Sequence, residues 1–473
     1  METLLKKPAR DVVSLLKKGE VSPLDLIDMA EKRISEVDKA VNALPTLCLD
    51  RARAHAKKLM AAPVAARPPY YLYGLPIVVK DIIDVEGVRS TRGSLTFKDH
   101  VPEISDILVQ VLEKNGAIVI GRSNTPEFAA GGNTFNEVFG ATLNPWDTTK
   151  TCGGSSGGTA VALATGQAWL GTGNDLAGSL RIPAAYCSVV GLRPSPGRVP
   201  NGPRAFLYDS MMVQGPMGRD VKDTALMLDA MAEHHMGDPM SLPRQAVSYS
   251  YILNHPLRPK KVAFSPNLGI LPIDPEVEKI CRQAADAWTK SGVVVEEVYL
   301  DLGNIEKVFN DIRAFLYTGN LGRAFMDENR ELIKPEVIWN IEQGLNLRVE
   351  DVSAAEKVRS GIYQQFYQLF QSFDLLICPA VAAQPFDVDI RYLTHLEGKE
   401  LETYVSWLIL TSALTVTACP ALSVPCGFTE KGLPVGLQML APPQREDQLL
   451  SAAWDFEKLG GLDSRVPIDP KVT

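Results

Sequence analysis

The stretch Cys152-Gly-Gly-Ser-Ser-Gly-Gly158 is the most informative part of this sequence, because it places two adjacent serines in glycine-rich backbone. A second glycine–serine pair follows in Gly178-Ser179-Leu-Arg-Ile-Pro183, and an upstream apolar run ends in lysine in Gly74-Leu-Pro-Ile-Val-Val-Lys80-Asp81. Serine is a weak nucleophile at neutral pH and needs a base. A lysine can be that base only where its surroundings keep it neutral. Together the three segments indicate a serine hydrolase whose base is lysine.

Length and composition indicate an ordinary globular protein. The chain has 473 residues, of which 45% are hydrophobic and 22% charged, enough to bury a large core. The net charge of -8 disfavours nucleic acid as a partner. Seven cysteines without a Cys-x-x-Cys pair indicate a reducing compartment. No signal peptide and no apolar run of membrane-spanning length is visible, so we expect a cytoplasmic protein without membrane association.

The alternation of predicted helices and strands indicates an α/β fold. Residues 1–65 have helical patterns, including the capping box Ser22-Pro-Leu-Asp25. Short apolar strands are then predicted at 77–79 and 117–120, with a helix over 105–115 between them. This order predicts a β-sheet covered by helices.

We expect one domain over residues 1–473, because no internal repeat, low-complexity tail or flexible linker is visible. Its centre, about 121–200, is rich in glycine, which lets backbone approach backbone or ligand closely. Late strands are predicted at 375–378, 415–425 and 435–440.

Other active sites with glycine-rich motifs fit this sequence poorly. Gly153-Gly-Ser-Ser-Gly157 matches the G-x-S-x-G nucleophile elbow, but that motif needs a preceding strand, and residues 144–151 are polar and turn-rich. None of the six histidines lies in a triad context. The lysine of a phosphate-binding loop is absent, and no cluster of metal ligands is visible. We therefore predict no metal and no cofactor.

The stretch from about 74 to 200 closely resembles the amidase signature family of serine hydrolases. Besides the segments quoted above, the resemblance is carried by Gly121-Arg-Ser-Asn-Thr-Pro-Glu-Phe128, Asp175-Leu-Ala-Gly-Ser-Leu-Arg-Ile-Pro-Ala184, Gly191-Leu-Arg-Pro194 and Gly432-Leu-Pro-Val-Gly-Leu-Gln438. It is weakest from about 240 to 400, where we expect a variable substrate-pocket region. The resemblance implies a large mixed central β-sheet covered by helices on both faces.

The resemblance also implies a Ser-cisSer-Lys triad. Ser179 matches the nucleophile, Ser155 the bridging serine and Lys80 the base. Lys80 would take a proton from Ser155, which would take one from Ser179. Ser155 would follow Gly154 in a cis peptide bond.

An oxyanion hole of backbone N–H groups is implied as well. These groups belong to Leu176, Ala177, Gly178 and Ser179. The family usually has glycine in place of Ala177, so alanine would carry modest strain if that position needs a positive φ. For Asp175 and Arg181 we expect a structural ion pair rather than a catalytic role.

The implied substrate pocket is small and apolar at Ala129. Gly131 and Gly132 would leave room for the acyl group. The candidates for the pocket entrance are Phe206, Leu207, Tyr208, Met211 and Met212. For each of these five, core packing is an equally good or better explanation.

We predict an amide-bond hydrolase that forms an acyl-enzyme on Ser179 and acts as a monomer or homodimer. Its substrate would be a small-molecule amide or, through the same chemistry, a carbamate (urethane) or ester. One alternative is the amidotransferase subunit that feeds ammonia to a tRNA-bound acyl group together with partner chains, which the acidic composition disfavours. The other is an inactive binding protein on the same scaffold.

A chelator should leave activity unchanged, because the sequence shows no ligand set for a metal. Hydrolysis of an amide before and after treatment with EDTA measures this. Loss of activity that a divalent metal restores would contradict the prediction.

Overall fold

The computed structural model describes residues 2–62, 67–460 and 466–472. Through this part of the chain runs an eleven-stranded sheet in the order β1-β3-β2-β6-β8-β7-β14-β15-β11-β9-β10. The strands are β1 (Thr46–Leu47), β2 (Pro76–Lys80), β3 (Ile118–Ser123), β6 (Leu170–Asp175), β7 (Val190–Arg193), β8 (Val213–Gly218), β9 (Lys261–Phe264), β10 (Val294–Glu297), β11 (Leu375–Pro379), β14 (Ala421–Phe428) and β15 (Pro434–Leu440). Two short hairpins lie outside it, β4 (Phe135–Asn136) with β5 (Gly140–Ala141) and β12 (His395–Leu396) with β13 (Lys399–Glu400).

The sheet is mixed, as expected. β3, β2 and β6 are parallel neighbours, and so are β11, β9 and β10. The pairs between β6 and β11 are antiparallel. The carboxyl ends of β2 and β6 therefore lie at the same edge of the sheet.

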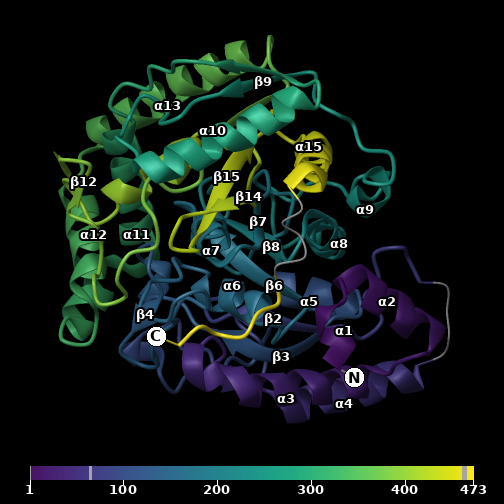
Figure 1. The fold of residues 1–473 in the computed structure, drawn as a ribbon. Coiled ribbons are helices and arrows are strands. Elements are labelled where there is room, and N and C mark those ends of the chain that lie inside the picture. The colour runs from purple at the N-terminus through teal and green to yellow at the C-terminus, as the bar shows by residue number, and fades with distance from the viewer. Residues whose placement is uncertain (1, 63–66, 461–465, 473) are drawn as a thin grey trace.

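Helices cover both faces of the sheet (Figure 1). They are α1 (Glu2–Lys6), α2 (Ala9–Lys18), α3 (Pro23–Val41), α4 (Leu49–Ala61), α5 (Ile107–Lys114), α6 (Gly157–Ala164), α7 (Arg181–Cys187), α8 (Val221–Met231), α9 (Tyr249–Ile252), α10 (Pro275–Lys290), α11 (Ile305–Asn329), α12 (Pro335–Asn346), α13 (Val349–Leu369), α14 (Ile409–Thr415) and α15 (Glu446–Gly460). In the described ranges none of these helices is long and apolar enough to cross a membrane.

Most predicted elements are present, with two corrections. The capping box of α3 is confirmed, since Ser22 and Asp25 exchange hydrogen bonds between side chain and backbone. The N-terminal region is not wholly helical, because β1 pairs with β3; residues 63–65 lie outside the described residues. The strand predicted from 415 is wrong, since Thr415 ends α14 and β14 begins at Ala421. The β-branched residues there favour a strand, but α14 is buried throughout and tertiary packing decides.

Glycines in three central strands let the segment after the second glycine–serine pair lie directly on the sheet. Gly173 in β6 and Gly215 in β8 are paired across the strands. A Cβ at these positions would lie 2.7 and 2.5 Å from the two Cδ atoms of Leu180, and one at Gly191 in β7 would overlap the Leu180 carbonyl oxygen. Leu180 therefore occupies the space that side chains on these strands would fill.

Gly215→Ala should lower the free energy of unfolding by about 1–3 kcal/mol, because the new Cβ overlaps Leu180 and the Leu192 carbonyl oxygen in a packed interior. The matched control is Gly361→Ala in α13, where nothing lies within 4 Å of the new Cβ. This control should stabilise by about 0.5–1 kcal/mol through helix propensity. Denaturant unfolding of both variants measures the difference. Equal free energies of unfolding for the two variants would show that the packing of Leu180 does not require glycine at position 215.

Candidate active site

Lys80, the last residue of β2, is fully buried, and its Nζ contacts three oxygen atoms. The distances are 2.6 Å to Ser155 Oγ, 3.0 Å to Ser156 Oγ and 2.6 Å to Asn174 Oδ1. Burial lowers the pKa of Lys80 well below its usual value, although the charge of Asp175 acts in the opposite direction. This environment favours the neutral amine, the form that can accept a proton.

The three oxygen atoms around Nζ differ in whether they can donate a hydrogen bond to it. An amide oxygen such as Asn174 Oδ1 only accepts, so it takes an N–H of the lysine. The Ser156 hydroxyl lies 3.5 Å from the Asn174 carbonyl, to which it donates. The Ser155 hydroxyl is then the group placed to donate to the lone pair of the neutral amine.

The loop before α6 connects the two glycine–serine segments. The Gly154–Ser155 peptide bond is cis, as the resemblance implies. The N–H of Ser156 donates to the Ser179 carbonyl at 3.1 Å. No strand precedes this loop, so the nucleophile-elbow geometry is absent from the described structure around it.

Ser179 is the residue of the predicted triad that borders open space. It lines a cavity of about 390 Å³ and is 8% exposed. Lys80 and Ser155 have no exposed surface. A bound substrate could therefore contact Ser179 directly but neither of the other two.

The backbone turn before Ser179 depends on Gly178, whose φ is 110°. A Cβ here would overlap Thr411, whose hydroxyl donates to the Ala177 carbonyl at 2.6 Å. Ala177 is not among the residues with positive φ, so the condition under which this alanine would be strained is not met. Glycine is needed one position later, where the chain reverses.

Of the four N–H groups predicted for the oxyanion hole, one is already used. The Gly178 N–H donates to Asp175 Oδ1 at 2.9 Å. The N–H groups of Leu176, Ala177 and Ser179 make no hydrogen bond within the described residues. Three donors thus remain for a ligand in the cavity.

The buried carboxylate of Asp175 organises this turn. It also accepts from the Leu180 N–H at 3.2 Å and pairs with Arg181 at 2.9 Å, with both side chains fully buried. Burial alone would raise the pKa of Asp175, but Arg181 and Arg193 lower it to about 2. The predicted structural ion pair of Asp175 with Arg181 is confirmed.

The predicted pocket residues separate into two groups. Ala129, Gly131 and Phe206 line the cavity with Ser179, as does Met212. The others do not line it: Gly132 packs against Trp407 and Leu408, Leu207 is half-buried, Tyr208 is 79% exposed, and Met211 is buried in the core. Their positions in sequence gave no means of telling these environments apart.

Sequence reasoning missed four residues that shape the site: Ser156, Asn174, Arg313 and Thr411. Ser156 and Asn174 each adjoin a residue already singled out, and this adjacency is the signal that could have found them. Arg313 and Thr411 come from distant helices and have no motif around them.

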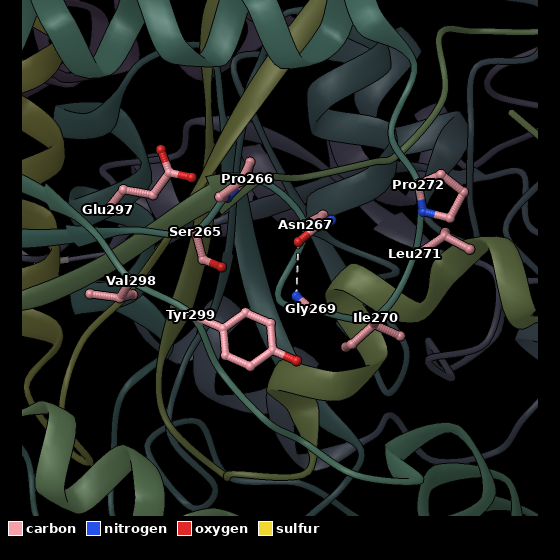
Figure 2. A pocket seen from close by; sticks show the side chains of 10 residues that line it. All are labelled: Ser265, Pro266, Asn267, Gly269, Ile270, Leu271, Pro272, Glu297, Val298 and Tyr299. Carbon is pink, nitrogen blue, oxygen red and sulfur yellow. Dashed lines mark hydrogen bonds between the residues drawn. The ribbon is translucent and has the colours of Figure 1, made fainter.

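A larger cavity of about 700 Å³ lies elsewhere, beyond the carboxyl ends of β9 and β10 (Figure 2). It is formed by segments 265–272 and 297–299. Its carboxylate, Glu297, pairs with Arg282 at 2.6 Å, and the Asn267 side chain bonds its own loop at Gly269 N. No residue of the predicted triad borders it, so we assign the active site to the smaller cavity.

Nothing in the described ranges brings together three or more His, Cys, Asp or Glu side chains in an arrangement that could hold a metal ion. Asp81, next to Lys80, pairs instead with Arg122 at 3.2 Å.

Comparisons with known proteins identify the family of this chain. A family model described as Amidase matches residues 25–450. An acylamidase from Rhodococcus erythropolis is 31% identical over 466 residues, 98% of each chain. A glutamyl-tRNA(Gln) amidotransferase subunit from Halothermothrix orenii is 31% identical over 96% of this chain and 97% of its own.

Among solved structures, a bacterial aryl acylamidase of the amidase signature family superposes with a TM-score of 0.88 at 27% identity, covering 98% of this chain and 99% of its own. A 6-aminohexanoate cyclic dimer hydrolase superposes with a TM-score of 0.86 at 26% identity over 99% and 100%. The match extends over nearly the whole chain in sequence and in fold, and this protein therefore belongs to the amidase signature family.

Proposed function

We propose that this protein hydrolyses the C–N bond of small-molecule amides through an acyl-enzyme formed on Ser179. One observation carries the proposal. The amine of Lys80, whose buried position favours the neutral form, contacts Ser155 in the interior, and of the three predicted triad residues only Ser179 borders the cavity. The base is shielded from solvent and the nucleophile is accessible, as covalent catalysis by serine requires.

The proposed reaction has two halves. Ser179 Oγ attacks the carbonyl carbon, its proton passing to Ser155 as Ser155 gives its own to Lys80. The C–N bond then breaks, and the amine leaves with the proton that Lys80 returns through Ser155. Water attacks the resulting ester and releases the acid. Carbamates and esters present the same carbonyl, so they are candidate substrates too.

The developing negative charge on the carbonyl oxygen needs N–H donors. We propose that the backbone N–H groups of Leu176, Ala177 and Ser179 supply them. We expected the Gly178 N–H to belong to this set, but it donates to Asp175 and so would stabilise the turn instead of the oxyanion.

Ser179→Ala should abolish turnover, because no other hydroxyl of the triad reaches the cavity. The matched control is Ser265→Ala, whose side chain borders the other cavity (Figure 2) and which should retain activity. Hydrolysis of an anilide and labelling by a fluorophosphonate probe measure both. Wild-type turnover by Ser179→Ala, or a label on Ser155, would refute the assignment.

The pH profile should report the ionisation of Lys80. Burial lowers the pKa of Lys80, so the amine should lose its proton at a lower pH than a free lysine, whose pKa is about 10.4. The value of kcat/KM should therefore rise with pH, and the midpoint of this rise should lie well below about 10.4. Lys80→Met should remove this limb and cost about 10²–10⁴-fold on amides. The loss should be smaller on activated esters, because an amine leaves only after protonation.

Lys334→Met is the matched control for this profile. Lys334 is half-buried, and this burial lowers its pKa to about 8, but its Nζ donates to the Ala130 carbonyl and not to a serine. This variant should keep the wild-type limb. If the rising limb is absent in Lys334→Met and present in Lys80→Met, the base is not Lys80.

A second candidate is the role of an amidotransferase subunit, which the similarity to glutamyl-tRNA(Gln) amidotransferase chains favours. Such a role would require partner chains. Turnover of simple amides by the purified chain alone supports the hydrolase, whereas activity that appears only with such a partner and tRNA supports the alternative.

A further inference from the structure

Arg313 of α11 is a buried cation without a buried anion to balance it. It lines the cavity that contains Ser179 and is 3% exposed. Three other deeply buried arginines pair with carboxylates: Arg122 with Asp81, Arg181 with Asp175 and Arg198 with Glu446. Arg219, also buried, instead donates to the backbone carbonyls of Leu5 and Lys7 and does not line the cavity. Arg313 makes no ion pair within the part of the chain that the structure describes.

The partners that Arg313 does have are neutral. Nη1 donates to Asn340 Oδ1, and Nη2 donates to the Tyr404 hydroxyl. The guanidinium carbon lies 4.7 Å from the centre of the Tyr317 ring. These contacts orient the side chain and engage part of its five N–H donors, but because the partners are neutral they do not cancel its charge. A buried charge without a counter-charge is costly, so its position beside a cavity suggests that a ligand supplies the anion.

The remaining charges of the cavity do not neutralise Arg313. Arg92 pairs with Asp84 at 3.1 Å, and Arg204 lies 3.7 Å from Asp209. Asp106 is the other acid in the lining; burial and the neighbouring Asp84 raise its pKa to about 7. The charged groups that act on Asp106 are Asp84, Arg122 and Arg92. The α11 side of the cavity is therefore positive.

The position of Arg313 relates it to the predicted acyl site. One helical turn along α11, the Tyr317 hydroxyl donates to the Phe128 carbonyl at 3.1 Å. Phe128 precedes Ala129, and both line the cavity with Arg313. Leu316 and Leu408 also line it, which gives an apolar path for the chain of a substrate.

We propose that Arg313 is a specificity-determining residue that binds a carboxylate on the acyl half of the substrate. The preferred substrates would then be monoamides of dicarboxylic acids, with the amide carbonyl at Ser179 and the free carboxylate at Arg313. Arginine suits this role because its planar donors match a carboxylate. The inference rests on the proposed amide hydrolysis at Ser179.

The test compares 4-nitroanilides of dicarboxylic acids of increasing chain length with counterparts whose free carboxylate is replaced by a carboxamide. The wild-type enzyme should favour the carboxylate at the best length by about 10–100-fold in kcat/KM, the range expected for hydrogen bonds between charged groups. Arg313→Gln should lose this preference by lowering kcat/KM for the carboxylate substrate. Its rate on the carboxamide counterpart should change by less than about threefold.

Arg92→Gln is the matched control, because its guanidinium lines the same cavity but already pairs with Asp84. It should leave the ratio between the two substrates within about threefold of wild type. Equal kcat/KM of the wild type for both substrates at every length would overturn the proposal. So would an equal loss on both substrates in Arg313→Gln, which indicates a structural role.

A binding measurement keeps the proposal testable if Arg313→Gln does not fold. Dicarboxylic acids should protect Ser179 of the wild type from a fluorophosphonate probe, and the corresponding diamides should protect it much less. Equal protection by both would refute the inference. Efficient hydrolysis of the carboxamide substrates without preference would refute only the role of Arg313, whereas no hydrolysis and no labelling of Ser179 would refute the proposed function itself.

Discussion

The amine of Lys80 lies in the interior against the Ser155 hydroxyl, and the surrounding architecture makes this contact possible. Lys80 ends β2, and Asn174 lies near the end of β6, the parallel neighbour of β2. Because parallel neighbours end at the same edge, the amine and the amide that accepts from it meet there. The serine loop then closes over this edge, directly before α6. Burial without a carboxylate contact lowers the pKa of this amine and so favours the neutral form, which is the form that can act as a base.

A second buried charge system holds the turn of Ser179, the proposed nucleophile, in place. Asp175 follows Asn174 in β6 and accepts hydrogen bonds from the backbone of the turn at Gly178 and Leu180. Arg181 and Arg193 compensate its charge. Breaking a buried pair of this kind is strongly destabilising because it leaves an uncompensated charge. The turn that carries Ser179 is thus held by its hydrogen bonds to the Asp175 carboxylate and by the packing of Leu180 on the glycines of β6, β7 and β8.

The cavity lies between the turn that carries Ser179 and helices from the part of the sequence, about 240–400, where the family resemblance is weakest. α11 and α12 anchor the segment after β3, through Tyr317 to the Phe128 carbonyl and Lys334 to the Ala130 carbonyl. The same helix α11 carries Arg313 into the cavity wall. In the proposed reaction, chemistry and substrate choice would come from different regions. The strand ends and glycine loops would hold the reacting groups, and the helices of 305–346 would face the rest of the substrate.

The sequence alone determined the α/β class and, with the family resemblance that its motifs carry, the mixed sheet and the segments that meet at the site. Short apolar runs, glycine clusters and caps are local signals, so the strand ending at Lys80 and the cap at Ser22 could be predicted directly. Only the tertiary structure decided which neighbours complete the site. Thr411, Arg313 and Asn340 act through contacts across more than one helix, and no local pattern encodes such contacts. The same holds for Gly132 and Tyr208, since burial or exposure of a loop residue depends on distant elements that pack against it.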